Sequence, residues 1–168
     1  MKRILTAIAA LALVAGAALP AAAGKIDDIR SAGKVRIGVS LGGEPIGFRD
    51  PQNNPVGYDV DVANRLAEKL GVPVELTDVS GDARISMLVS GQLDIVVANT
   101  SATLERAKSV DFTIPYNRAG LRVIVQADSG IQSLEDLAGK SVVVGRGTTG
   151  ETFMKEQVPD ATLVYVDQ

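Results

Sequence analysis

The chain contains no histidine, no cysteine and no tryptophan. The first two absences exclude a catalytic histidine, a cysteine nucleophile and the commonest zinc ligands, so we expect neither a metal site nor a cofactor. The absence of cysteine fits an oxidising compartment, and it fits equally a protein that never needed disulfides. Any chemistry must therefore use carboxylates, arginine, lysine, tyrosine and hydroxyl groups.

The first 23 residues have the composition of a secretory signal peptide. Lys2 and Arg3 precede an uncharged run rich in alanine and leucine, and three alanines at 21–23 offer a cleavage site. A membrane anchor is the alternative, but the run is shorter than the roughly 20 residues that span a bilayer. No cysteine follows the cleavage site to carry a lipid, so we expect a soluble protein in the periplasm.

The mature chain is acidic. Removal of residues 1–23 takes away Lys2 and Arg3 but no acidic residue, which leaves 15 basic and 20 acidic side chains and a net charge of −5. An acidic surface does not attract the phosphates of nucleic acids, so we expect no nucleic-acid partner.

After residue 34, hydrophobic patterns alternate between strand-like and helix-like periods. Strands are predicted at 35–39, 74–79 and 95–98, and helices at 57–70 and 84–89. Such alternation predicts a mostly parallel sheet with ligands bound beyond the carboxyl ends of the strands. Loop 99–103 should therefore face a ligand. Asp59 and Asp61 lie at a helix start, where carboxylates compensate the helix dipole.

A second α/β unit follows. Its predicted elements are a strand at 121–125, a helix at 133–138, a strand at 141–144, a turn at 147–150, a helix at 151–157 and a strand at 161–166.

Several short motifs follow one another along the mature chain. The most characteristic motif is GYDVDVA at residues 57–63. The others lie at residues 33–39, 90–94, 103–106, 110–116, 134–140 and 147–149. Each motif alone is weak, but together they cover nearly the whole mature chain. In their order and spacing they resemble the motifs of the polar amino-acid-binding proteins of ATP-binding-cassette (ABC) importers, the family 3 solute-binding proteins.

The resemblance implies an α/β fold of the type II periplasmic-binding-protein class, in which two lobes close on a ligand. Residues 24–117 would form a nearly complete lobe one, and residues 118–168 an incomplete lobe two. Family members continue further and return to complete lobe one, so the sequence resembles a chain truncated at its C-terminus. We expect this form to bind ligand poorly because apolar surface stays exposed.

The resemblance places Arg106 where the family binds the ligand carboxylate. A guanidinium suits this role because its planar donors pair bidentately with a carboxylate. Without the resemblance, Arg106 would more simply form a surface ion pair with Glu105. Ser101 matches a ligand-binding hydroxyl, and Asn99 matches a position whose carbonyl accepts from the ligand ammonium. From sequence alone, both could equally be loop-capping residues.

In lobe two, Thr148, Thr149 and Gly150 match a loop whose backbone amides point at the ligand carboxylate from a helix N-terminus. Arg146 matches a basic position that faces the ligand. As bare sequence, these residues indicate only a turn, and the lysine of a phosphate-binding loop does not follow them.

Two positions depart from the family pattern. Aromatic side chains usually wall the ligand where this chain has Gly43 and Gly81, so the cleft would be roomier or filled by another aromatic such as Phe48. The acid that usually meets the ligand ammonium would lie beyond Gln168.

The resemblance implies a receptor and not an enzyme. We expect a periplasmic monomer that captures a small amino acid or related zwitterion and delivers it to the membrane permease of an ABC importer. The alternative is a periplasmic enzyme on the same scaffold, similar to a cyclohexadienyl or arogenate dehydratase, with a carboxylate as general acid. The sensor domain of a signalling receptor would need a transmembrane helix downstream.

Overall fold

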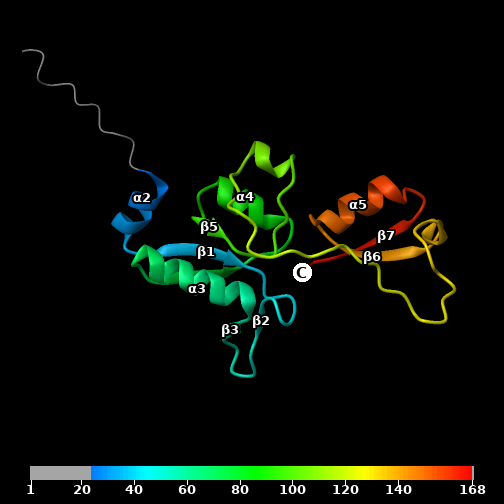
Figure 1. The fold of residues 1–168 in the computed structure, drawn as a ribbon, viewed down its shortest axis with the longest axis horizontal. Helices are drawn as coiled ribbons and strands as arrows, with labels where there is room; N and C mark the ends of the chain where they lie inside the picture. The colour runs from blue at the N-terminus through cyan, green and yellow to red at the C-terminus, as the bar shows by residue number, and fades with distance from the viewer. Residues whose placement is uncertain (1–23, 168) are drawn as a thin grey trace, which may run out of the picture.

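The computed structural model describes residues 24–167. The signal peptide predicted for residues 1–23 therefore lies outside the described residues. Among the helices of residues 24–167, none is long and apolar enough to cross a membrane. Figure 1 shows two α/β units side by side, joined by an extended segment. We call the unit around strand β1 the first lobe and the unit around strand β6 the second lobe.

The first lobe is built on a parallel sheet of three strands. Their spatial order is β4 (Val74–Asp78), β1 (Val35–Val39) and β5 (Ile95–Val96). The central strand β1 is apolar and mostly buried, because strands pair with both of its edges and helices cover its faces. The predicted parallel sheet is confirmed, although β5 is shorter than the strand predicted at 95–98.

Helix α3 (Tyr58–Leu70) packs its apolar stripe on this sheet. Val60, Ala63 and Ala67 are buried at steps of three and four residues, and they belong to the main core of the lobe. Gly71 ends the helix in the left-handed conformation, with φ of 76°, and its amide bonds to the last carbonyls of the helix. Helix α4 (Ala83–Val89) packs beside β5. Both helices confirm the prediction from periodicity.

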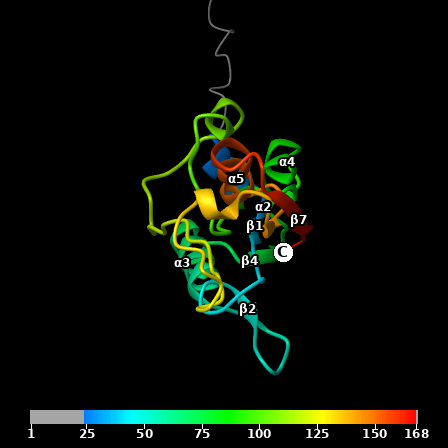
Figure 2. The ribbon, with the colours of Figure 1, turned by 90° about the vertical axis from the view of Figure 1, so that its right-hand side faces the viewer.

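The sequence pattern does not predict two features of the first lobe. Helix α2 (Lys25–Ala32) precedes β1 and buries only Ile29, so its apolar periodicity is weak. Strands β2 (Phe48–Arg49) and β3 (Pro55–Val56) form an antiparallel hairpin that projects from the lobe (Figures 1 and 2). Each of these strands has two residues, which is too short for alternation to be visible.

The second lobe is a smaller α/β unit. Two parallel strands are connected by one helix. The elements are β6 (Ser141–Gly145), α5 (Thr149–Gln157) and β7 (Thr162–Val166). The core consists of Leu137, Val144, Met154 and Val158. These elements confirm the predicted strands and the later helix. The helix predicted at 133–138 is only a 3₁₀ turn, η2 (Glu135–Leu137).

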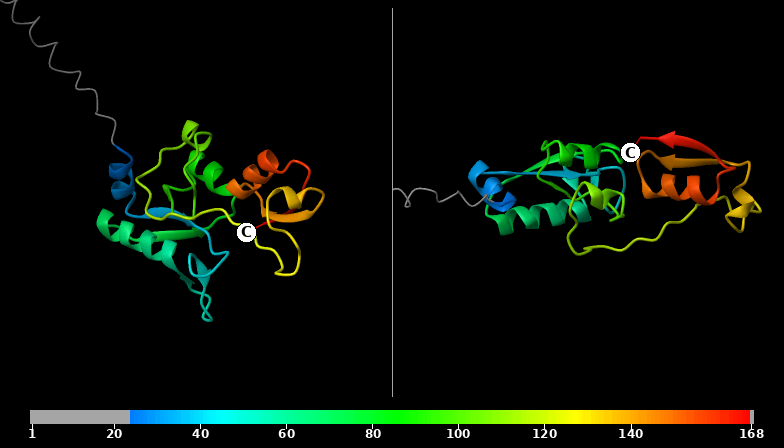
Figure 3. Two further views of the ribbon diagram at one scale, coloured as in Figure 1. Left: turned by 45° about the vertical axis from the view of Figure 1, so that its right-hand side comes forward. Right: turned by 90° about the horizontal axis from the view of Figure 1, so that it is seen from above.

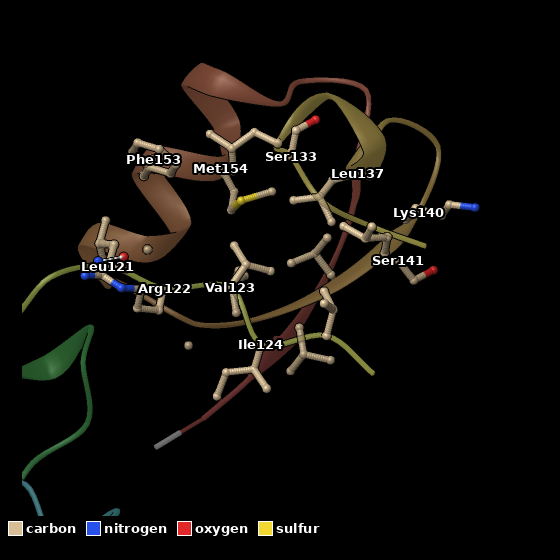
Figure 4. Close-up of a pocket in the computed structure, with 18 of the residues that line it drawn as sticks. Leu121, Arg122, Val123, Ile124, Ser133, Leu137, Lys140, Ser141, Phe153 and Met154 are labelled. Carbon is tan, nitrogen blue, oxygen red and sulfur yellow. Dashed lines mark hydrogen bonds between the residues drawn. The ribbon is translucent and has the colours of Figure 1, made fainter. Parts of the chain in front are cut away.

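Residues 121–125 do not form the predicted strand. They line one side of a cavity of about 860 Å³ whose other walls include β6 and α5 (Figure 4). Among the described residues, no strand pairs with this segment. The consecutive β-branched residues Val123, Ile124 and Val125 favour extended backbone, but a strand forms only when a neighbour satisfies its backbone groups. Leu121 and Ile124 therefore stay exposed.

The two lobes lie end to end, with their sheets directed towards a common junction. Figure 3 shows α3 and α5 on the same side of the two sheets in the right-hand view. The loops that follow β1, β5 and β6 meet at the junction, where they line one cavity.

An ion pair connects β1 to the residue that precedes β5. Asp94 accepts from the side chain of Arg36 at 2.7 and 3.0 Å and from its amide at 3.0 Å, and Lys25 Nζ lies 2.8 Å from the same carboxylate. The Asp94 side chain is only 7% exposed. The bonds from Arg36, and then that from Lys25, hold the pKa of Asp94 well below its usual range.

We expect Asp94→Asn to lower the free energy of unfolding by about 2 kcal/mol at pH 7, because charge-assisted hydrogen bonds are lost. A carboxyl group whose pKa is lower in the folded state than in the unfolded state stabilises the folded protein at pH values above its unfolded pKa of about 4. This stabilisation is lost as the pH falls towards the folded-state pKa. The deficit of the variant should therefore shrink in acid. Urea unfolding at pH 7 and pH 3 measures both effects.

Glu75→Gln is the control, because Glu75 pairs with Lys34 at 2.6 Å while both side chains are about half exposed. Exposed pairs contribute little, so we expect no measurable change. Equal losses in the two variants would contradict the assignment.

Candidate functional site

A cavity of about 480 Å³ lies between the lobes. Its walls come from loops at the carboxyl ends of the parallel strands, where ligand sites of α/β sheets form. Most of the residues predicted from sequence line it, namely Asn99, Ser101, Arg106, Thr148, Thr149 and Gly150. The structure thus brings two loops from different lobes around one space.

Arg146 is not among the lining residues of this cavity. Its Nε lies 3.4 Å from Asp167 Oδ1, and its guanidinium carbon lies 4.7 Å from the centre of the Tyr165 ring. These contacts direct the side chain along β7, away from the position predicted to face the ligand. Phe48, the displaced aromatic considered from sequence, does not line the cavity either.

The guanidinium of Arg106 bridges the two lobes. Its Nη1 donates to the Ser101 carbonyl at 2.8 Å, and its Nη2 donates to the Gly147 carbonyl at 3.0 Å. Burial lowers the pKa of Arg106, although the group stays cationic because its ordinary value is so high. Among the described residues, Arg106 has no ion-pair partner. The bridge uses two of its five N–H groups and leaves the others available.

The N-terminus of helix α5 forms the wall that belongs to the second lobe. Thr148 caps it, since its Oγ1 accepts from the Glu151 amide at 3.2 Å and donates to the Gly145 carbonyl at 2.7 Å. Within residues 24–167, the amides of Thr149 and Gly150 make no hydrogen bond. Free amides and the positive end of the helix dipole together favour an anion.

Comparison with known proteins agrees with this two-lobed arrangement. Residues 35–163 match the sequence model of the bacterial extracellular solute-binding proteins, family 3. The chain belongs to this family. Its fold is the type II periplasmic-binding-protein fold of the amino-acid-binding structures that it resembles.

Several known proteins are similar to this solute-binding protein. The arginine-binding extracellular protein ArtP of Bacillus subtilis is 39% identical over 127 residues, which cover 76% of this chain and 49% of ArtP. Cyclohexadienyl dehydratase of Pseudomonas aeruginosa is 30% identical over 167 residues, which cover 97% of this chain and 62% of the enzyme. The cysteine-binding protein from Campylobacter jejuni aligns with a TM-score of 0.82 at 37% identity, over 85% of this chain and 59% of that one. This chain therefore spans about half to three fifths of its relatives.

A buried carboxylate holds the loop that follows β5 in place. Asp59 is fully buried, and its oxygens accept from the Asn99 amide at 2.7 Å and from the Tyr116 hydroxyl at 3.0 Å. The Tyr58 hydroxyl donates to the Tyr116 carbonyl at 3.0 Å. One side chain at the start of α3 thus connects the loop after β5 to the start of the segment that leads to the second lobe.

The role of Asp59 corrects the expectation that it serves mainly as a helix-start charge, which the exposed Asp61 still can. Burial raises the pKa of Asp59 against the lowering effect of its two hydrogen bonds. Burial of the phenol, and then the Asp59 charge, raises the pKa of Tyr116 well above its ordinary value. The sequence signal for Asp59 was its place in the GYDVDVA motif, which does not reveal the partner of the carboxylate.

Arg84 lines the cavity, and sequence reasoning missed it. It lies in α4, is only 4% exposed, and donates from Nη1 to the carbonyls of Ala98 and Asn99 and to Thr100 Oγ1. It therefore supports the backbone of the same loop from the opposite side to Asp59. This support matters because Asn99 has a positive φ of 45°, which is uncommon for a residue other than glycine.

The two glycines that stand where the family usually has aromatics lie in different surroundings. A Cβ atom at Gly81 would lie 2.5 Å from the Arg146 carbonyl, so the backbone of the second lobe occupies the place of any side chain there. A Cβ atom at Gly43 would meet nothing within 4 Å, and Gly43 lines the cavity. The cleft is therefore open at Gly43 and closed by the opposite lobe at Gly81. Within the described residues, no group of acidic side chains could hold a metal ion.

We expect Asp59→Ala to lower the free energy of unfolding by about 2 to 3 kcal/mol, because the Asn99 amide and the Tyr116 hydroxyl lose their acceptor. Asp59→Asn should cost less, since the amide oxygen still accepts one bond. Asp61→Ala, an exposed change in the same helical turn, should stay within about 0.5 kcal/mol of the parent. Thermal denaturation ranks the three, and a similar loss for Asp61→Ala would refute the role given to Asp59.

Proposed function

We propose that this protein is the extracytoplasmic receptor of an amino-acid ABC importer. It is a periplasmic monomer that binds a small amino acid or related zwitterion between its lobes and delivers it to a membrane permease. Membership of the solute-binding family and amino-acid-binding relatives support this role. Binding is the whole task of such a receptor, so the site needs complementary charges and no reacting group.

The observation that carries the proposal is the position of Arg106. Its guanidinium lines the interlobe cavity with donors to spare, and it contacts the turn that begins α5. A ligand carboxylate placed there meets the guanidinium and the free amides of Thr149 and Gly150. The Asn99 carbonyl and the Ser101 hydroxyl supply acceptors for a ligand ammonium.

Calorimetric titration of the complete secreted protein with a panel of amino acids tests the proposal. At least one amino acid should bind. Arg106→Ala should lower the affinity for that amino acid roughly 100-fold, because the ligand carboxylate loses its charged partner inside the cleft. Lys108→Ala is the control, since Lys108 belongs to the same 3₁₀ turn, η1 (Arg106–Lys108), but pairs with Glu105 at the surface. If no amino acid gives a heat of binding, the receptor proposal is refuted.

A dehydratase is the second candidate, because a cyclohexadienyl dehydratase is among the relatives and Glu44 supplies a carboxylate in the cavity lining. Such an enzyme needs a general acid positioned at the leaving hydroxyl. We expect the receptor role to hold, so the complete protein should not convert prephenate or arogenate in an ultraviolet absorbance assay. Turnover that Glu44→Gln abolishes would establish the enzyme instead.

A further inference from the structure

The interlobe cavity is lined by two guanidinium groups. Arg84 and Arg106 both contribute to its wall, and they come from different elements, α4 and η1. Arg106 is held by carbonyls of both lobes, whereas Arg84 is held by the loop at residues 98–100. They therefore form two separately anchored positive sites in one space.

Arg84 keeps one nitrogen available for a ligand. Its Nε donates to the Ser80 carbonyl at 3.4 Å, and its Nη1 makes the bonds to the loop at residues 98–100. Its Nη2 has no hydrogen-bond partner among residues 24–167. Every buried side-chain nitrogen or oxygen of these residues does have a partner, so Nη2 is not fully buried. Nη2 must therefore be reached by solvent, and the cavity that Arg84 lines is where solvent meets this otherwise buried side chain.

The charges around the cavity leave these cations only partly compensated. Within the described residues, neither guanidinium takes part in an ion pair. Burial, and then the charge of Arg106, lowers the pKa of Arg84, while Asp59, Tyr116 and Asp82 act in the opposite direction. The oxygens of Asp59 are already engaged by Asn99 and Tyr116.

The lining itself contains one acidic side chain, Glu44, against two arginines. The N-terminus of α5 adds a further partial positive charge. A ligand that carries one carboxylate and one ammonium would satisfy Arg106 and the α5 amides, but it would add no negative charge at Arg84, which Asp59 and Asp82 compensate only in part. Buried unpaired charge is costly, so a second anionic group on the ligand is the natural complement.

We propose that the ligand is an amino acid with a second carboxylate in its side chain, and that Arg84 binds this side-chain carboxylate. The proposal rests on the receptor function proposed above and names the class of its ligand. Arg84 thus determines specificity, while Arg106 and the α5 amides bind the carboxylate common to all amino acids.

The first test uses the unmodified protein. The complete secreted protein is titrated calorimetrically with glutamate and glutamine, which have nearly the same shape and differ in one charge, and with aspartate and arginine. Glutamate or aspartate should bind at least 10-fold more tightly than glutamine or arginine. A neutral or basic amino acid as the tightest ligand overturns the second anion site but leaves the receptor function intact. No binding of any amino acid overturns both.

The second test asks whether Arg84 causes the preference. Arg84→Gln should reduce the ratio of glutamate to glutamine affinity to near 1. Arg65→Gln removes the same charge from an exposed position on α3, and it should leave the ratio unchanged. A preference that survives in folded Arg84→Gln protein overturns the assignment to Arg84.

Arg84 also supports the loop at residues 98–100, so circular dichroism and thermal denaturation accompany each variant. Arg84→Lys keeps the charge with fewer directional donors, and it should retain most of the glutamate preference. If Arg84→Gln does not fold, Arg84→Lys and the glutamate-to-glutamine ratio of the parent decide the question.

Discussion

The bridge made by the Arg106 guanidinium is the interaction on which the arrangement of the site depends. It joins the Ser101 carbonyl in the first lobe to the Gly147 carbonyl in the second, so it sets how the two loop walls face one another. Next to this bridge, the backbones of the two lobes lie too close together to leave room for a side chain. Cβ atoms at Gly81 and Gly147 would each lie 2.5 Å from backbone atoms of the opposite lobe. Glycine at both positions therefore permits the close approach that the bridge requires.

The loop that carries Asn99 is held from two sides by buried charged groups. Asp59 accepts from its amide, and Arg84 donates to its carbonyls, so oppositely charged side chains stabilise complementary parts of one short backbone segment. Hydrogen bonds to charged groups are stronger than neutral ones and are directional. They explain how a loop at the end of a two-residue strand can keep a positive φ at Asn99. The site is thus built from backbone held in place by side chains that lie mostly behind it.

The second lobe contributes to the site through the start of α5, and the rest of its structure is less closed. One face of its sheet packs against α5 and η2, while Val143, Val164 and Val166 point outward and are exposed. The segment at residues 121–125 has the residues of a strand, but no strand among the described residues pairs with it. Local preference is therefore not sufficient for β structure, because the backbone of a strand is satisfied only by another strand.

The sequence by itself determined the elements whose signal is local. The steps of Val60, Ala63 and Ala67 predicted α3, and the alternation at residues 35–39 predicted the strand β1. The motif order led to the family and to most of the predicted site residues that the structure places around the cavity. Tertiary structure decided what depends on partners distant in the chain. It turned Arg146 towards Tyr165 and Asp167, buried Asp59 against Asn99 and Tyr116, and brought Arg84 into the cavity. A residue's own neighbours in sequence specify its backbone preference, but the charge it meets is specified only when the loops of two lobes are folded together.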